Sequence, residues 1–423
     1  MNRILFLVLL TCFLFSCSGK GGAFGGRTPL QRYAQKLIDA DLRTTTLGGL
    51  WLRAYDSSLQ APEVVSLPYR KAGYFADTEP RAVSIAFAAG RGSGLQIDVT
   101  PRSAGDFRLY TELWRQESDG QYRLVHAFDS AQRAYTYTAD KEEKLLLRLQ
   151  PELLQKGEYT LSITVGPSLA FPVPRGRIGS VWGDARDGGA RRHEGIDIFA
   201  PRRSAIIAIA PGTVGRVETT RRGGKVVWLR PDDRPINLYY AHLEEQLVEA
   251  GDRVDIGDTI GLVGTTGNAK GTPPHLHFGI YGRGGAIDPE PYVDPELKRP
   301  GLVARSVAGN WMRLRRAIEW NGIEFSPNEL LRVTDVDERF AIGYTPGCQK
   351  LKVALSNLQN IDNQIVRLSN AAYIPLLDEP SERAAAQQAI APRGSVYLRG
   401  FWRDYALVRQ GTLEGWVPRG VLR

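Results

Sequence analysis

The chain has 423 residues, which is enough for three or more domains, and its hydrophobic share of 43% is sufficient for ordinary packed cores. The formal net charge of +8 arises from 54 basic and 46 acidic residues that are spread along the chain. We therefore predict no nucleic-acid partner, because such partners are bound by clustered basic residues. A disulfide framework is excluded, since two of the three cysteines lie in the first 17 residues and only Cys348 remains beyond them.

Residues 1–17 are typical of an export signal peptide. Arg3 supplies the positive start, and Ile4 to Phe15 form a largely apolar run of 12 residues, shorter than the about 20 that a spanning helix needs. The run ends in Leu14-Phe15-Ser16-Cys17, which resembles a bacterial lipoprotein box and implies that Cys17 is lipidated. With Ser18 after the cysteine, the same resemblance implies a cell-envelope protein with a lipid anchor in the membrane, at the periplasmic face of the outer membrane.

Residues 18–27 are rich in glycine and predict a flexible tether, and residues 28–80 follow as a helical segment. Thr28 is a suitable N-cap, with Pro29 at the first helical position. Apolar residues then recur at the helical period, namely Leu30, Tyr33, Ala34, Leu37, Ile38 and Leu42. We expect this stripe to pack on the next domain; the alternative is a helix that binds a partner.

In residues 81–171 apolar residues recur at every second position, as in Leu95-x-Ile97-x-Val99, with turn residues between the alternating runs. This pattern predicts a β-sandwich-like accessory domain. The segment faintly resembles the accessory domains of secreted bacterial proteases, and a role as spacer, binding domain or autoinhibitor stays open. His126 lies on one alternating run without a carboxylate near it in sequence, so we interpret it as structural.

Four of the five histidines lie between residues 177 and 293, and their spacing indicates a metal site. Side chains two or four positions apart share one face of a strand, so His193 pairs with Asp197, and His275 with His277. Two imidazoles and one carboxylate leave a fourth tetrahedral position open, which is typical of a catalytic rather than a structural zinc. A water molecule at that position has its pKa lowered from about 15.7 toward roughly 7.

The motifs His193-x-x-x-Asp197 and His275-x-His277, with the glycine-rich surroundings at 195–201, 251–261 and 264–268, resemble the lysostaphin-type (LytM-domain) zinc endopeptidases over residues 172–296. The resemblance implies an antiparallel β domain that holds one Zn²⁺ ion through His193, Asp197 and His277. It further implies that His275 is the general base and that His242 orients the attacking water or stabilises the oxyanion.

By the same resemblance, the substrate is a peptide bond in the stem peptides or cross-links of bacterial peptidoglycan. Some relatives lack ligands and only activate amidases, so a non-catalytic envelope scaffold or amidase activator is the alternative function. Trp182 and Tyr240 are expected either to line the substrate groove or to lie in the core. The glycine-rich segment 264–271 predicts a loop at the rim of the cleft or a plain connector.

The carboxy-terminal residues 364–423 resemble a bacterial Src-homology-3-type module, through Tyr405-Ala-Leu-Val-Arg and Glu414-Gly-Trp-Val417, and residues 304–360 suggest a second copy. Such modules often bind peptidoglycan, the alternative being a structural role for Trp402 and Trp416. The sequence therefore predicts a mainly β, multidomain protein with a β-sandwich-like domain, an antiparallel β peptidase domain and small β-barrel modules. Nothing in it indicates the oligomeric state.

Overall fold

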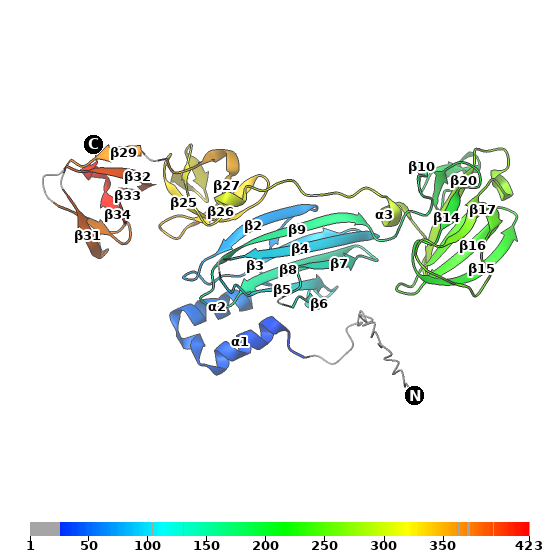
Figure 1. Ribbon diagram of the computed structural model, residues 1–423, viewed down its shortest axis with the longest axis horizontal. Coiled ribbons are helices and arrows are strands. Elements are labelled where there is room, and N and C mark those ends of the chain that lie inside the picture. The colour runs from blue at the N-terminus through cyan, green and yellow to red at the C-terminus, as the bar shows by residue number, and fades with distance from the viewer. Residues whose placement is uncertain are drawn as a thin grey trace, which may run out of the picture.

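The structure is a computed structural model that describes residues 26–422 except 104, 130, 363, 370–372 and 392. The predicted signal peptide, Cys17 and nearly all of the tether lie outside these residues. Strands dominate the described chain and form several separate sheets, which confirms the prediction of a mainly β, multidomain protein (Figure 1). Within the described part of the chain, no helix combines the length and the apolar character required to cross a membrane.

Two helices open the described chain, α1 (Pro29–Asp39) and α2 (Thr46–Ser57). Thr28 caps α1 as expected: its Oγ1 accepts from the Gln31 amide at 3.1 Å, while its own amide donates to Gln31 Oε1 at 2.9 Å. The apolar stripe packs against Tyr110 of the following domain through buried side chains of both helices, Leu30, Ala34, Leu37, Trp51 and Leu52. The expectation that this stripe packs on the next domain is therefore confirmed, except for Ile38, which is exposed.

A buried ion pair lies between these two helices and the β domain that follows them in the chain. Glu112 and Arg148 are paired with side-chain exposures of only 1% and 3%. Thr28 Oγ1 donates to Glu112 Oε1 at 2.5 Å, and Arg148 donates to Ser58 Oγ at 3.1 Å. The pair thus ties the start of α1 and the end of α2 to one sheet.

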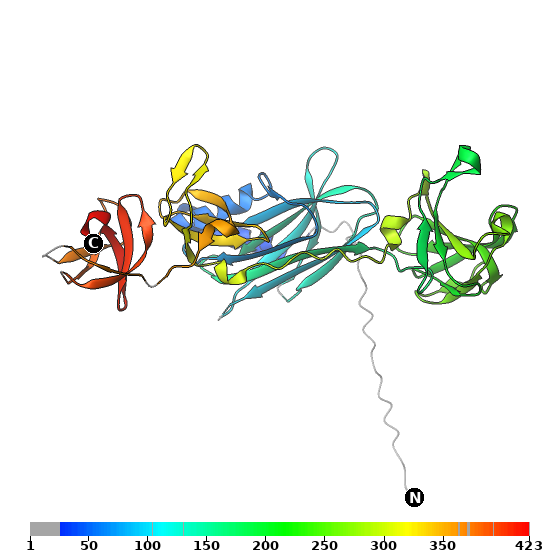
Figure 2. The same cartoon turned by 90° about the horizontal axis from the view of Figure 1, so that it is seen from above.

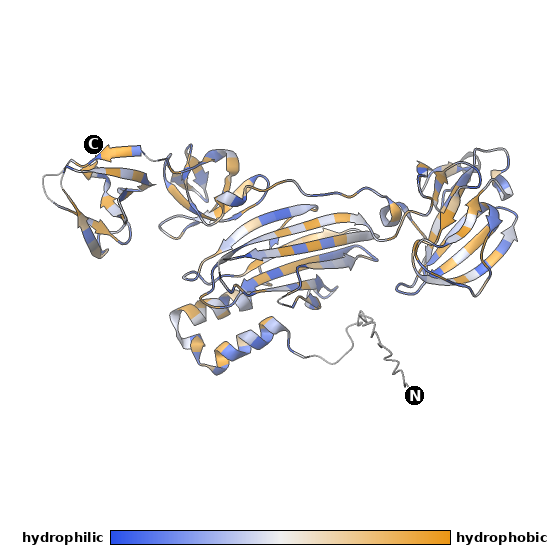
Figure 3. Cartoon of the chain, in the orientation of Figure 1, coloured by the Kyte–Doolittle hydropathy of each residue, from blue (hydrophilic) through white to orange (hydrophobic). Residues whose placement is uncertain are grey.

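That sheet is one of the two layers of a β-sandwich. Its strand order is β1-β3-β8-β5-β6, and the facing layer contains β2-β9-β4-β7. The two layers share one core in which Ile85, Leu147, Ile97 and Leu161 are fully buried. The strands are β1 (Glu63–Val64), β2 (Tyr69–Phe75), β3 (Val83–Ala89), β4 (Ser93–Arg102), β5 (Leu109–Gln116), β6 (Tyr122–Ala127), β7 (Ala134–Thr138), β8 (Glu143–Pro151) and β9 (Gly157–Pro167). Figure 3 shows the alternation of apolar and polar residues along them.

The predicted boundary at residue 81 differs from the structure. Strand β2 lies inside the segment 28–80, yet it pairs with β9 from Tyr69 to Phe75 and is part of the sandwich. Tyr69 and Phe75 point into the shared core, and this tertiary packing decides the assignment. The segment 28–80 is therefore helical only in its first half.

The domain predicted at residues 172–296 is inserted between two parts of the chain that lie side by side. After β9 the amide of Leu169 donates to the carbonyl of Tyr292 in α3 (Glu290–Val293) at 2.8 Å. The returning segment then pairs Lys298 with Val165 of β9. The chain leaves and rejoins the same end of the sandwich, and the inserted domain projects from that end (Figures 1 and 2).

The inserted domain is built on a ten-stranded sheet in which every pairing is antiparallel, as predicted. The main order is β10-β13-β20-β17-β16-β15-β18, with β14, β19 and β21 at its sides. The strands are β10 (Arg177–Ser180), β13 (Ile196–Phe199), β14 (Ala205–Ile207), β15 (Gly212–Thr220), β16 (Gly224–Pro231), β17 (Asn237–Gln246), β18 (Arg253–Val254), β19 (Thr259–Val263), β20 (His275–Gly282) and β21 (Gly285–Ile287). A small hairpin, β11 (Ala185–Arg186) and β12 (Arg191–Arg192), lies before β13.

The next strands extend the sandwich instead of forming an isolated module. Strand β25 pairs with β2 through Ala72–Val336 and Gly73–Asp335, so its group joins the same sheet. Asp335 is buried at this junction, where it accepts from Tyr159 Oη at 2.5 Å and from Arg81 Nη1 at 2.9 Å. The strands that join this sheet are β22 (Trp311–Leu314), β25 (Leu330–Val336), β26 (Phe340–Tyr344), β27 (Lys350–Ala354) and β28 (Leu358–Gln359), whereas β23 (Ile318–Trp320) and β24 (Ile323–Phe325) form a separate two-stranded sheet.

The last strands form a six-stranded sheet in the order β29-β32-β33-β34-β30-β31. They are β29 (Gln364–Arg367), β30 (Ile374–Leu377), β31 (Ala386–Ile390), β32 (Ser395–Trp402), β33 (Tyr405–Gln410) and β34 (Leu413–Pro418). Trp402 and Trp416 are buried in a core shared with Met312 and Leu330 of the preceding strands, which favours the structural role for both tryptophans. The Src-homology-3-type assignment of both regions stays a prediction.

Candidate metal centre and active site

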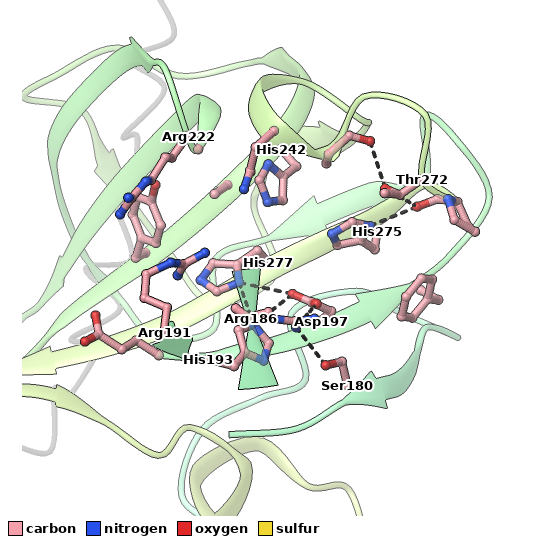
Figure 4. Close-up of a pocket in the computed structure, with 18 of the residues that line it drawn as sticks. Ser180, Arg186, Arg191, His193, Asp197, Arg222, His242, Thr272, His275 and His277 are labelled. Carbon is pink, nitrogen blue, oxygen red and sulfur yellow. Dashed lines mark hydrogen bonds and ion pairs between the residues drawn. The ribbon is translucent and has the colours of Figure 1, made fainter. Parts of the chain in front are cut away.

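Strands β13 and β20 lie side by side and bring the predicted metal ligands together. Asp197 pairs directly with His277 in the antiparallel ladder, and His193 lies on the segment that enters β13. His277 Nδ1 is 3.0 Å from His193 Nε2 and 3.0 Å from Asp197 Oδ1, and His193 Nε2 is 3.1 Å from Asp197 Oδ1. Three donor atoms therefore form a nearly equilateral triangle (Figure 4).

Gly195 makes this approach possible. A Cβ at that position would lie 2.5 Å from the carbonyl oxygen of Phe278 and 2.7 Å from Cε1 of His277. Any larger residue would push the chain carrying His193 away from β20, so the glycine in the motif has a steric role at the site.

Backbone carbonyls fix the tautomers of three histidines. A carbonyl oxygen only accepts, so a ring nitrogen within hydrogen-bond distance of it carries the proton. His193 Nδ1 donates to Val181 O, His242 Nδ1 to Thr266 O and His275 Nδ1 to Pro273 O, each at 2.9 Å. When these rings are neutral, Nε2 of each one has a lone pair available.

The second oxygen of Asp197 is held by an arginine that the sequence analysis did not identify. Arg186 Nη2 donates to Asp197 Oδ2 at 2.6 Å and to Ser180 Oγ at 2.7 Å. Burial alone would raise the pKa of Asp197, but hydrogen bonds from His193 and His277 lower that pKa well below its ordinary value. Asp197 is therefore a carboxylate with Oδ1 directed at the two imidazoles and Oδ2 at Arg186.

His242 and His275 flank this triangle. The His242 ring lies 5.1 Å from the ring of His275 and 5.9 Å from that of His277, measured between centroids. Burial, followed by the nearby His277 and His275, lowers the pKa of His242 to about 4. Burial also lowers the pKa of His277. Both rings are therefore uncharged at neutral pH.

The chemistry of the three donors fits a divalent cation. With a neutral His193 protonated on Nδ1 and a neutral His277 protonated on Nε2, the three atoms His193 Nε2, His277 Nδ1 and Asp197 Oδ1 are all acceptors, and acceptors repel one another unless a proton or a cation lies between them. Ligands about 2.0–2.1 Å from a tetrahedral zinc lie roughly 3.3 Å from each other, close to the spacing of these atoms. Donor atoms of the three residues lie within 4.8 Å of one another.

The triangle opens into a cavity of about 400 Å³. The rim includes Asn268 and Thr272, so the glycine-rich segment, which contains the short 3₁₀ turn Gly267–Ala269, lies at the cleft. Two tyrosines of neighbouring strands, Tyr239 and Tyr281, line the wall next to His277. Trp182 is half-buried and is not part of this lining.

Of the two alternatives for Tyr240, the structure supports the core and not the groove. Tyr240 is fully buried in the core of the domain, and its neighbour Tyr239 lines the cavity instead. The reason is an irregularity in β17: between Tyr240 and Leu243 the pairing with β16 shifts by one residue, and His242 has a left-handed φ of 65°. The simple alternation that would place Tyr240 beside His242 is broken there.

Comparison with known proteins agrees with this geometry. Residues 191–289, which contain all five predicted site residues, match peptidase family M23. An L-Ala–D-Glu endopeptidase of Bacillus subtilis is 37% identical over 139 residues, covering 29% of this chain and 42% of the relative. The peptidoglycan DD-endopeptidase ShyC of Vibrio cholerae is 37% identical over 91 residues, covering 22% and 20%.

The lipoprotein YgeR of Escherichia coli, which is uncharacterized, is 37% identical over 115 residues, covering 27% of this chain and 43% of the relative. The chain thus spans less than half the length of each of these three relatives. Residues 191–289 are therefore a domain of peptidase family M23.

Proposed function

We propose that this protein is a zinc-dependent endopeptidase that hydrolyses peptide bonds in bacterial peptidoglycan. The observation that carries the proposal is the triangle of donor atoms, 3.0 to 3.1 Å apart, with two further imidazoles beside it. The names of two relatives, an L-Ala–D-Glu endopeptidase and a peptidoglycan DD-endopeptidase, support the choice of substrate.

In this proposal His193, Asp197 and His277 hold the zinc ion. The ion supplies Lewis-acid polarisation of the substrate carbonyl and a lowered pKa for the attacking water. Arg186 keeps Oδ2 of Asp197 engaged, so Oδ1 alone faces the other two donors. Such a partner orients a ligand and is a usual part of a metal site.

The two flanking histidines act on protons. His275 has its Nδ1 hydrogen committed to Pro273 O, so its Nε2 accepts a proton from the attacking water and later returns it to the leaving amine. His242 has its Nδ1 hydrogen committed to Thr266 O, and its pKa of about 4 leaves Nε2 without a proton at neutral pH. It therefore accepts a hydrogen bond and orients the water; stabilising an oxyanion would require an N–H at that position.

The proposed location is the cell envelope, with a lipid anchor on Cys17 at the periplasmic face of the outer membrane. The lipoprotein box in the sequence and the lipoprotein relative support it. Incorporation of a labelled fatty acid into the full chain, and its loss in Cys17→Ala, tests the anchor. Equal labelling of both chains would contradict it.

The decisive experiment incubates the form beginning at Ser18 with isolated peptidoglycan and analyses the released fragments by mass. We expect new amine termini from the wild-type chain and none from His277→Ala. A chelator should abolish the release, and added zinc should restore it. A chain that binds the wall and stimulates an amidase, but releases no fragments itself, would replace this proposal with that of a non-catalytic activator.

A further inference from the structure

The cavity beside the donor triangle contains an arginine whose side chain has no partner among the residues that the structure describes. Arg222 lies in the turn between β15 and β16, lines the cavity and is exposed to solvent. Its guanidinium makes no ion pair or hydrogen bond with any described residue, whereas Arg186 in the same cavity is neutralised by Asp197. Figure 4 shows the Arg222 side chain on the side of the cavity where His242 and His277 lie.

The backbone that carries Arg222 is held in place by the active site itself. The amide of His242 donates to the carbonyl of Gly223 at 2.7 Å, and the amide of Asn268 donates to the carbonyl of Arg222 at 2.9 Å. Lys225 N donates to Thr266 Oγ1 at 2.9 Å. The turn is thus hydrogen-bonded both to the backbone of His242 and to the loop at the rim that contains Thr266 and Asn268.

Gly224, in the same turn, packs closely against the rim loop. Gly224 has a φ of 65°, and a Cβ there would lie 2.1 Å from Thr266 Oγ1. Only glycine has both the conformation and the size that this position requires, so the backbone of the turn lies directly against the rim loop. The backbone of Arg222 is therefore held beside the cavity, and its exposed side chain is available to a ligand there.

We propose that Arg222 binds a free carboxylate of the substrate next to the bond that is cleaved. A guanidinium offers two parallel N–H groups that match a carboxylate, and a primary amide cannot replace the charge. The substrate class is therefore a peptide with an ionised carboxylate near the scissile bond. This inference rests on the proposed peptidase function and adds a specificity to it.

The test uses one synthetic cross-linked dimer of wall stem peptides in two forms, with its carboxylates free or converted to primary amides. Cleavage is measured as kcat/KM with the zinc-loaded chain from Ser18 to the carboxy terminus. Binding of both forms is measured separately by calorimetry with the metal-free chain, because a carboxylate also coordinates zinc. The matched control is Arg221→Gln, since Arg221 is an exposed arginine in the same turn that does not line the cavity.

We expect the wild-type chain and Arg221→Gln to prefer the free acid by about tenfold, in both kcat/KM and affinity. Arg222→Gln should reduce the preference to less than about twofold, and Arg222→Lys should keep part of it because the charge remains. Equal use of both forms by the wild type, or a preference that survives in Arg222→Gln, would overturn the inference. If neither form is cleaved, the proposed peptidase function fails, and the binding measurement alone decides the role of Arg222.

Discussion

Asp197 and His277 are direct partners across β13 and β20, and Asp197 Oδ1 lies 3.0 Å from His277 Nδ1. The distance between these two groups is therefore set by the register of a β-ladder and not by the flexibility of a loop. A slip of one residue would turn one of them to the opposite face of the sheet. The core residues Ile196, Ile198, Leu276 and Phe278, which alternate with them and are fully buried, hold that register.

Replacing His277 and replacing His275 should have different effects. His277→Ala removes one of three donors, so we expect loss of both bound zinc and turnover. His275→Ala leaves the donor triangle intact, so zinc should stay at one ion per chain while kcat falls by at least about a hundredfold. Metal analysis of the purified variants, with turnover measured in parallel, checks this. Loss of zinc in His275→Ala would instead assign that residue to the metal.

Acid should destabilise the metal-free protein through His242. Its pKa is about 4 in the folded state and 6.5 in the absence of the fold, so the unfolded state binds the extra proton between these values. Stability is therefore fully present above about pH 6.5 and is lost as the pH falls toward 4. We expect the free energy of unfolding to fall by about 2 kcal/mol more between pH 7 and pH 5 than in His242→Gln. Urea denaturation at both pH values measures this difference. An equal fall in the free energy of unfolding between pH 7 and pH 5 in the two chains would refute it.

Glu112→Ala should loosen the amino-terminal helices. The substitution leaves Arg148 charged and almost completely buried, which costs about 3–5 kcal/mol of stability. Urea denaturation measures the loss, and limited proteolysis should cut α1 and α2 first. Glu112→Met combined with Arg148→Met should recover most of the stability, because no unpaired charge remains. A control is Glu117→Ala, whose partner Arg115 is 29% exposed, and this variant should change little.

Asp335→Ala should free β25 from the sandwich. The substitution leaves Arg81 and Tyr159 without their shared acceptor, a change expected to cost about 2–4 kcal/mol. Hydrogen exchange of the amides in β2 and β25 should accelerate, while that of β13 and β20 in the peptidase domain should not. Asp77→Ala is the matched control, because this carboxylate pairs with Lys156 at an exposed position. Unchanged exchange in Asp335→Ala would show that apolar packing alone holds the junction.

The sequence was most informative where a local period determines geometry. The spacing of two in His275-x-His277 placed that pair on one face, whereas His193 lies outside β13 (Ile196–Phe199) and reaches the same cavity from the segment before the strand. The apolar stripe of α1 likewise predicted the packing on Tyr110. Both patterns depend only on the geometry of a single strand or helix.

What could not be predicted depends on contacts between distant segments. Arg186 is one of 54 basic residues, and no local pattern marks it as the partner of Asp197. The pairing of β25 with β2 joins residues more than 250 positions apart in the chain, and no local pattern in either strand predicts this pairing. The sequence left open whether Tyr240 lines the groove or lies in the core, because the alternation breaks at His242, whose left-handed backbone is not apparent from its residue type.

The paired Val165 and Lys298 have a practical consequence for the molecule as a whole. Because the two connections to the inserted domain are already joined to each other, the remaining chain needs only a short loop to close the gap. Replacing residues 168–296 with such a loop should therefore leave a chain, made of the sandwich and the carboxy-terminal strands, that still folds. The same arrangement would allow the inserted domain to be exchanged for a domain of another specificity without changes to the sandwich.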